Sequence, residues 1–144
     1  MRTRPLFVTM AVAATCVVAV PAASQAAGIV ATGGSLASMT GSASPYGISQ
    51  ARGASLAAQH SSPGPVRVRL HLADDQSTDQ MGINQMIGFT GARVAAVLGP
   101  TLSGVAAADP IAGAAGIPVL GVTNTTLDIA DAGPTFWRVS LSEN

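Results

Sequence analysis

Short apolar segments recur along the chain and predict the strands of a sheet. The segments 28–31, 94–98, 118–122 and 135–141 are expected as strands, and 94–98 is apolar throughout, as a central strand buried on both faces would be. In 66–72, apolar and polar residues alternate, which predicts a strand at the sheet edge with one exposed face. The first strand is expected to end in two glycines, Gly33-Gly34, and to lead into a polar loop over 35–45.

Helical spacing of apolar residues fills the intervals between these strands. Residues 46–59 predict a helix, and Ser77 or Thr78 is placed to cap a second helix that continues to Gly91. An alanine-rich helix is expected over 102–115. Strands that alternate with helices imply right-handed crossovers, so we predict an α/β fold with a three-layer, Rossmann-like parallel sheet.

The apolar side of the first helix is predicted from its periodicity. Ile48, Ala51, Ser55 and Ala58 recur at helical spacing and are expected on one side. On the opposite, polar side we expect the long polar residues of this helix, which are Gln50, Arg52 and Gln59.

The first 26 residues have the pattern of a secretory signal peptide. Arg2 and Arg4 precede an uninterrupted apolar-to-neutral run over 6–20, Pro21 breaks the run, and Ser24-Gln25-Ala26 supplies small residues for cleavage. The run is shorter than the roughly 20 residues that a membrane-spanning helix needs. We therefore expect an exported protein with no membrane span in its mature part, 27–144; an uncleaved anchor is the alternative.

Composition excludes several classes of function for the mature chain. Hydrophobic residues make up 48% and charged residues 10% of the sequence, which is ample for a core in one domain of this size. The only cysteine, Cys16, lies inside the apolar run, so we expect it to be removed; lipid attachment there is the alternative. The mature part has five arginines and seven acidic residues, without the basic patch that nucleic acids require.

Signatures of enzymes, metals and cofactors are missing. The sequence has no dinucleotide or phosphate-loop glycine motif, no nucleophile elbow and no lysine, so we expect no catalysis and no cofactor. Asp74-Asp75 has no histidine or glutamate placed to complete a metal site and is expected in a solvated loop, or Asp75 caps the second helix or holds the loop. His60 and His71 are expected on the surface.

Polar residues follow several predicted strands, at the edge where a parallel sheet binds ligands. The loops are 35–46, 100–104 and 123–126. Ser103 lies in the first turn of the third helix, whose free N–H groups and dipole favour an anion. Thr123-Asn124-Thr125 adds uncharged donors and acceptors. The combination predicts a socket for a small polar ligand, and in particular for its carboxylate.

The ordered set of motifs in these loops resembles the first lobe of a type I periplasmic binding protein. The nearest branch is that of the leucine/isoleucine/valine-binding receptors of ABC transporters. The motifs are Gly34-Ser35-Leu36, Thr40-Gly41, Pro45-Tyr46-Gly47, Ala73-Asp74-Asp75-Gln76, Val97-Leu98-Gly99-Pro100, Ser103-Gly104 and Gly116-Ile117-Pro118-Val119-Leu120.

The resemblance implies a function and a set of site residues. It implies the solute-binding component of an ABC importer, with an amino acid or amide as ligand and a permease as partner. Ser103, the backbone of Thr123, and Thr125 would hold the carboxylate and ammonium groups of the ligand, and Tyr46 would pack on its side chain.

In one respect the sequence departs from that family. Family members have two lobes that close over the ligand, whereas this sequence ends at Asn144, just after a predicted strand. We therefore expect a first lobe only, which would bind its ligand weakly or not at all. A ligand-sensing ectodomain of the same fold and an inactive gene fragment are the alternatives.

Overall fold

The computed structural model of the 144-residue chain describes residues 28–61, 65–101, 105–125 and 133–140. The predicted signal peptide lies outside the described residues. No helix within the described ranges is both long and apolar enough to cross a membrane.

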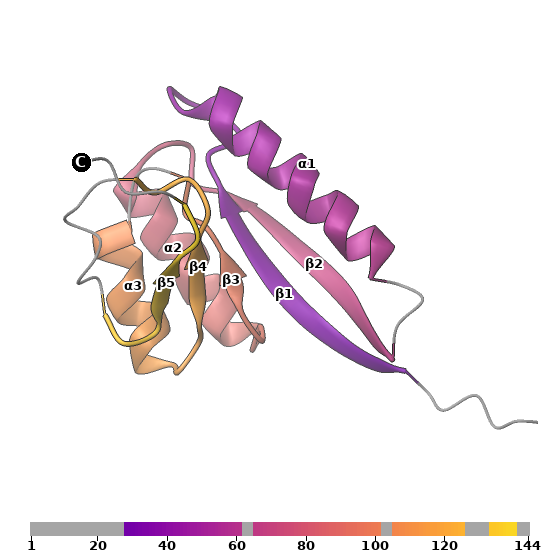
Figure 1. Ribbon diagram of the computed structural model, residues 1–144. Helices are drawn as coiled ribbons and strands as arrows, with labels where there is room; N and C mark the ends of the chain where they lie inside the picture. Colours follow the sequence, from indigo (N-terminus) through magenta and orange to yellow (C-terminus); the bar gives the residue numbers. More distant parts are fainter. Residues whose placement is uncertain (1–27, 62–64, 102–104, 126–132, 141–144) are drawn as a thin grey trace, which may run out of the picture.

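In the described part of the chain, five parallel strands form one sheet in the order β2-β1-β3-β4-β5 (Figure 1). Their bounds are β1 Ile29–Ala37, β2 Val66–Asp74, β3 Val97–Leu98, β4 Val119–Gly121 and β5 Phe136–Arg138. The alternating segment predicted as an edge strand is β2, at one edge, and the continuous apolar run supplies β3 in the centre. The predicted α/β fold with a parallel sheet is confirmed.

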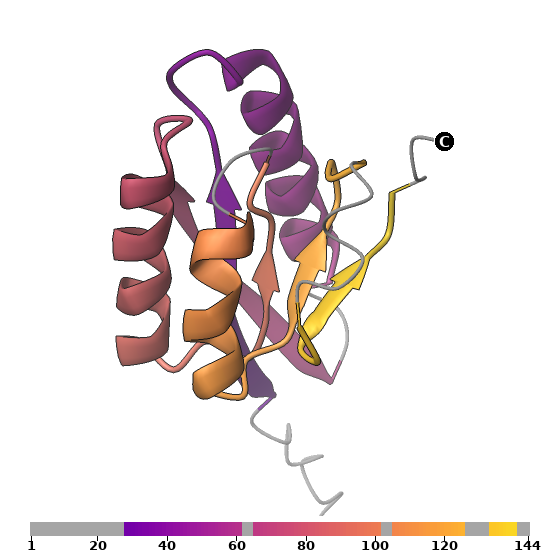
Figure 2. The ribbon, with the colours of Figure 1, turned by 90° about the vertical axis from the view of Figure 1, so that its left-hand side faces the viewer.

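Within the described residues, three helices follow β1, β2 and β3 and cover the two faces of the sheet. Their bounds are α1 Ser44–His60, α2 Asp79–Gly91 and α3 Val105–Ala114. Helix α1 packs on one face, against β1 and β2, while α2 and α3 lie side by side on the other face (Figure 2). The predicted cap of α2 is confirmed, because the hydroxyl of Thr78 accepts a hydrogen bond from the N–H of Met81 at 3.4 Å.

The hydrophobic core lies between the sheet and the α2–α3 layer. Phe89 and Met86 of α2 are fully buried against the inward-facing strand residues Leu36, Val97 and Val119. Small residues of α3 complete this layer, since Ala108 and Ala112 are also fully buried.

Strand β1 is longer than predicted. The sequence suggested that it would end at Gly33-Gly34, but the strand runs through both glycines to Ala37, and the loop begins at Ser38. The reason is a close approach between β1 and helix α2: a Cβ at Gly34 would lie 3.1 Å from the ring of Phe89. Glycine therefore serves here to admit an aromatic ring and not to make a turn.

The buried side of α1 also differs from the prediction. Gly47, Ala51 and Ala54 face the sheet, whereas Ile48 is 37% exposed. Gln50, expected on the polar side, instead reaches the sheet and donates to the carbonyl of Leu36 at 2.9 Å. Small residues bring the helix close to β1 and β2, and apolar periodicity alone does not identify such a contact face.

The α1 face of the sheet carries an apolar row that continues past the helix. Leu98, Leu120 and Trp137 are register partners on neighbouring strands, on the face opposite Val97, Val119 and the α3 layer. Helix α1 lies over β1 and β2, and Trp137 is 51% exposed. Within the described residues, no helix covers this end of the row (Figure 2).

Candidate functional site at the carboxyl edge of the sheet

The loops that follow β1, β2, β3 and β4 meet at one edge, because all these strands run in the same direction. This edge is where an open parallel sheet accepts ligands. Hydrogen bonds between side chains and backbone tie each of these loops to its neighbour.

Thr101, which follows β3, is the residue on which these connections converge. Its side chain is fully buried. The Thr101 hydroxyl accepts a hydrogen bond from the N–H of Ser38 at 2.9 Å and donates one to the Oε1 of Gln50 at 3.1 Å. The side chain of Gln50 also donates to the carbonyls of Leu36 at 2.9 Å and Leu98 at 3.4 Å. A single residue of α1 thus holds the ends of β1 and β3 together.

The carbonyl of Thr101 joins the β3 loop to the segment after β4. It accepts hydrogen bonds from the hydroxyl of Thr123 and, at 3.3 Å, from the side-chain Nδ2 of Asn124. The carbonyl of Asn124 in turn accepts from the hydroxyl of Ser140 at 2.5 Å. This chain of contacts fixes the backbone of 123–124 beside that of Thr101.

Two glycines allow the loops to come this close. Gly99 has a φ of +106°, and a Cβ there would lie 1.9 Å from the carbonyl oxygen of Leu36. At the start of α1, a Cβ at Gly47 would lie 2.1 Å from the carbonyl oxygen of Ser38. No other residue fits either position without moving the backbone.

Asp75 is buried, not solvated as the sequence suggested. Its Oδ1 accepts from the hydroxyl of Ser38 at 2.5 Å and from the N–H of Ser77 at 2.9 Å, and its exposed fraction is 0%. The partner Ser38 is 37 residues away in sequence, so local pattern gave no sign of it. The alternative that Asp75 holds the loop is confirmed; the cap of α2 is Thr78.

Asp74 binds the loop after β1 through its whole carboxylate. Oδ1 accepts from the N–H groups of Met39 at 2.8 Å, Thr40 at 3.2 Å and Gln76 at 2.9 Å, while Oδ2 accepts from the hydroxyl of Thr40 at 2.7 Å. Desolvation acts to raise the pKa of Asp74, but the hydrogen bonds from Thr40, Gln76 and Met39 outweigh it and lower the pKa below its ordinary value. Both aspartates therefore organise loops. Within the described residues no three His, Cys, Asp or Glu side chains are grouped as a metal site would need.

The four predicted ligand-binding residues differ in exposure, and one of them lies outside the described residues. Tyr46 is 60% exposed in the first turn of α1, at the carboxyl edge. Thr123 is half-buried with its hydroxyl bound to Thr101, so only its backbone is left to face a ligand. Thr125 is half-buried just beyond it, and Ser103 lies outside the described residues.

The residues that shape this edge were not identified from the sequence; they are Ser38, Gln50, Thr101 and Asn124. Thr101 and Asn124 belong to polar loops that were singled out, but their partners lie on other strands and helices. Ser38, Thr101 and Asn124 are buried, and the polar side chains of all four residues hold the loops together by hydrogen bonds and carry no charge. Such an edge suits a small, neutral or zwitterionic ligand.

Comparisons with known proteins give the fold a family context. No protein-family model matches the chain, nor does any curated protein. Solved structures do match. The chain is similar to the branched-chain amino acid transporter substrate-binding protein LivJ of Streptococcus pneumoniae, solved with isoleucine, at a TM-score of 0.71 and 21% identity. That alignment covers 80% of this chain and 34% of LivJ.

Two further solved structures of ABC transporter binding proteins match a similar share of this chain. A solute-binding protein of an ABC transporter from Rhodopseudomonas palustris, solved with 3,4-dihydroxybenzoic acid, matches at a TM-score of 0.73 and 19% identity, over 78% of this chain and 32% of that one. An ABC transporter substrate-binding protein from Sphaerobacter thermophilus matches at a TM-score of 0.67 and 29% identity. That alignment covers 78% of this chain and 33% of the other.

The chain therefore has the fold of one lobe of a type I periplasmic binding protein, as the resemblance implied. It spans about a third of the length of the solved structures that it matches.

Proposed function

We propose that this chain is a solute-binding component of an ABC importer and supplies one wall of a site for a branched-chain amino acid or its amide. The proposal is supported most directly by the Thr101 carbonyl, which ties the β3 loop to the backbone of Thr123 at the carboxyl edge. The matched structures are binding proteins of ABC transporters. Under this proposal the chain binds and delivers its ligand without chemical conversion, and it is exported after removal of residues 1–26.

The roles of the site residues follow from the chemistry of an amino acid. Ser103 and the start of α3 bind the ligand carboxylate, because the free N–H groups and dipole of a helix start attract an anion. The backbone of Thr123, together with Thr125, binds the ammonium or amide group. Tyr46, with its ring largely exposed at the start of α1, covers the aliphatic side chain of the ligand.

One wall leaves the ligand in contact with water on its other side. Binding proteins of this kind gain affinity when two walls close around the ligand. We therefore expect the isolated chain to bind more weakly than the micromolar range. Calorimetry against leucine, isoleucine and valine tests this point, and micromolar binding by a monomer would contradict it.

Weak binding is detected more sensitively by NMR signals of the ligand than by the heat of binding in calorimetry. Saturation-transfer NMR with leucine and isovaleramide is expected to show transfer from the protein to the aliphatic protons. Tyr46→Ala is expected to reduce that transfer, whereas Tyr46→Phe, which keeps the ring, preserves it. The residue is 60% exposed, so neither substitution disturbs the core. No transfer, or equal transfer to both variants, would count against the proposed site.

A further inference from the structure

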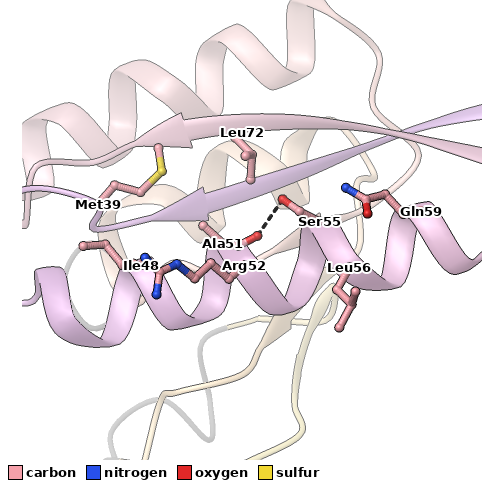
Figure 3. Close-up of a pocket in the computed structure, with 8 residues that line it drawn as sticks. All are labelled: Met39, Ile48, Ala51, Arg52, Ser55, Leu56, Gln59 and Leu72. Atoms are coloured by element: carbon pink, nitrogen blue, oxygen red, sulfur yellow. Dashed lines mark hydrogen bonds between the residues drawn. The ribbon is translucent and has the colours of Figure 1, made fainter.

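A hollow lies between α1 and the edge strand β2, and it starts at Met39 in the loop after β1 (Figure 3). Its volume is about 370 Å³, within the range of small-molecule sites. The walls are largely apolar. Their apolar side chains are Met39, Ile48, Ala51, Leu56 and Leu72.

Several of these apolar side chains are exposed despite their size. Leu56 is 57% exposed, Leu72 39% and Ile48 37%. Small residues of α1 pack on β1 and β2, which leaves the larger side chains of the helix and the edge strand at the rim of the hollow. Covering these side chains would remove apolar surface from water, which is the main source of affinity for an apolar ligand.

One positively charged side chain, that of Arg52, lines this hollow. Arg52 lies one turn from both Ile48 and Leu56 on the same row of α1 and lines the hollow with them (Figure 3). Within the described residues, it forms no ion pair or hydrogen bond. Its guanidinium therefore remains available to a carboxylate.

The hollow continues along β2 towards a second arginine. An adjoining hollow of about 340 Å³ shares Ser55, Gln59 and Leu72 with the first and reaches Arg67. The hydroxyl of Ser55 already donates to the carbonyl of Ala51 at 2.7 Å, so it adds no free polar group to the floor. The groove is thus an apolar floor with Arg52 beside its first part and Arg67 beside its second.

In the described part of the chain, no acidic side chain of α1 or β2 pairs with Arg52 or Arg67. Helix α1 contains none, and the single acid of β2, Asp74, has its carboxylate occupied by the loop after β1. A second copy of this face would bring arginines against arginines, so charge disfavours self-association here. Charge complementarity instead favours an occupant that is apolar and anionic.

We propose that the groove between α1 and β2 binds a carboxylate with an aliphatic or aromatic body, with the carboxylate on Arg52 and the body over Ala51 and Leu72. The row from Arg52 to Gln59 extends over about 10 Å of helix rise, enough for an aliphatic chain of medium length. This ligand and this site are separate from the amino-acid site at the carboxyl edge and do not depend on it.

The test compares decanoate with decan-1-ol, which has the same chain but no charge. Displacement of a neutral fluorescent naphthylamine dye by each compound is measured on the purified protein, below the concentration at which decanoate forms micelles. We expect decanoate to bind more tightly, and Arg52→Gln to weaken decanoate by about fivefold without affecting decanol. Ser55→Leu, which fills the floor, is expected to weaken both.

Arg69→Gln is the matched control. Arg69 is exposed on β2, lines neither hollow, and its substitution changes the net charge equally. It is expected to leave decanoate binding unchanged. Equal binding of decanoate and decanol, no displacement by either, or equal losses in Arg52→Gln and Arg69→Gln would overturn the proposal. So would a dimer in sedimentation analysis that Ser55→Leu dissociates, since the occupant would then be a second copy.

Discussion

The hydroxyl of Thr101 accepts a hydrogen bond from the backbone N–H of Ser38 at 2.9 Å, across 63 residues of sequence. Both residues are fully buried, and each follows a strand of the central pair β1 and β3. The contact fixes the relative position of two loops at the carboxyl edge. The shape of this edge therefore depends on Thr101 more than on any residue that would touch the ligand.

Replacing Thr101 with valine keeps the shape of the side chain and removes its hydroxyl. The N–H of Ser38 and the Oε1 of Gln50 then lose a partner in a buried setting. We expect a loss of about 1 to 3 kcal/mol in the free energy of unfolding, measured by urea denaturation. Thr90→Val on α2, where the hydroxyl bonds only within its own helix, is the control and is expected to change stability by less than about 0.5 kcal/mol.

Gly99→Ala is expected to be among the most damaging single substitutions. The added Cβ would lie 1.9 Å from the carbonyl oxygen of Leu36, at a φ of +106° that alanine rarely adopts. We expect a loss of more than about 3 kcal/mol in unfolding free energy. Gly53→Ala provides the contrast, because a Cβ on that exposed helical residue meets nothing within 4 Å. It is expected to stabilise by about 0.5 to 1 kcal/mol, so destabilisation by both substitutions would show that the close approach at Gly99 is not the cause.

Protonation of Asp74 at low pH is expected to reduce the stability that its carboxylate gives to the loop after β1. Because the pKa of Asp74 is lower in the folded chain than its ordinary value, its carboxylate adds stability above about pH 4, and that contribution is lost as pH falls through the folded pKa. We expect Asp74→Asn to lower the free energy of unfolding by about 1 to 3 kcal/mol at pH 7. The difference in unfolding free energy between wild type and variant is expected to shrink below about pH 4.

Two further aspartates shape how that experiment is designed. Asp109 is buried, and desolvation raises its pKa, so it destabilises the fold at neutral pH and less so as pH falls. Comparing wild type with Asp74→Asn at each pH cancels this opposite trend. Asp79→Asn is the control, since Asp79 is exposed in the first turn of α2. If the difference in unfolding free energy between wild type and Asp74→Asn did not change with pH, the charge of Asp74 would not stabilise the loop after β1.

Trp137 reports on the uncovered end of the sheet. It is the only tryptophan of the chain and is 51% exposed beside Leu120 on the α1 face. We expect fluorescence emission close to that of free tryptophan in water, and ready quenching by acrylamide. Blue-shifted emission that resists quenching in the monomer would mean that this face is covered.

The fold was largely predictable because its signals are local. The apolar run before Gly99 and the alternation in β2 identified a central and an edge strand, and both are placed as predicted. The length of β1 was not predictable. Gly33-Gly34 has the composition of a turn, and only the ring of Phe89, brought in from α2, explains why these glycines stay in a strand.

The site was predictable only in outline. The loops were identified because polar residues follow apolar strands, but Ser38, Thr101 and Asp75 act through partners that the sequence places far away. Gln50 was assigned to the solvent side of α1 because small residues, not large apolar ones, make the contact with the sheet. Non-local hydrogen bonds of this kind leave no periodic trace in a sequence.

The proposed function places one wall of an amino-acid site on the loops after β1, β3 and β4. The sharpest test is a titration of the isotope-labelled protein with millimolar leucine, followed through its backbone amide NMR signals. We expect the shifts to concentrate at Tyr46, at residues 99–104 and at 123–125, with α2 unaffected. Shifts confined to the α1–β2 groove, or no shifts at these loops at any leucine concentration, would contradict the claim.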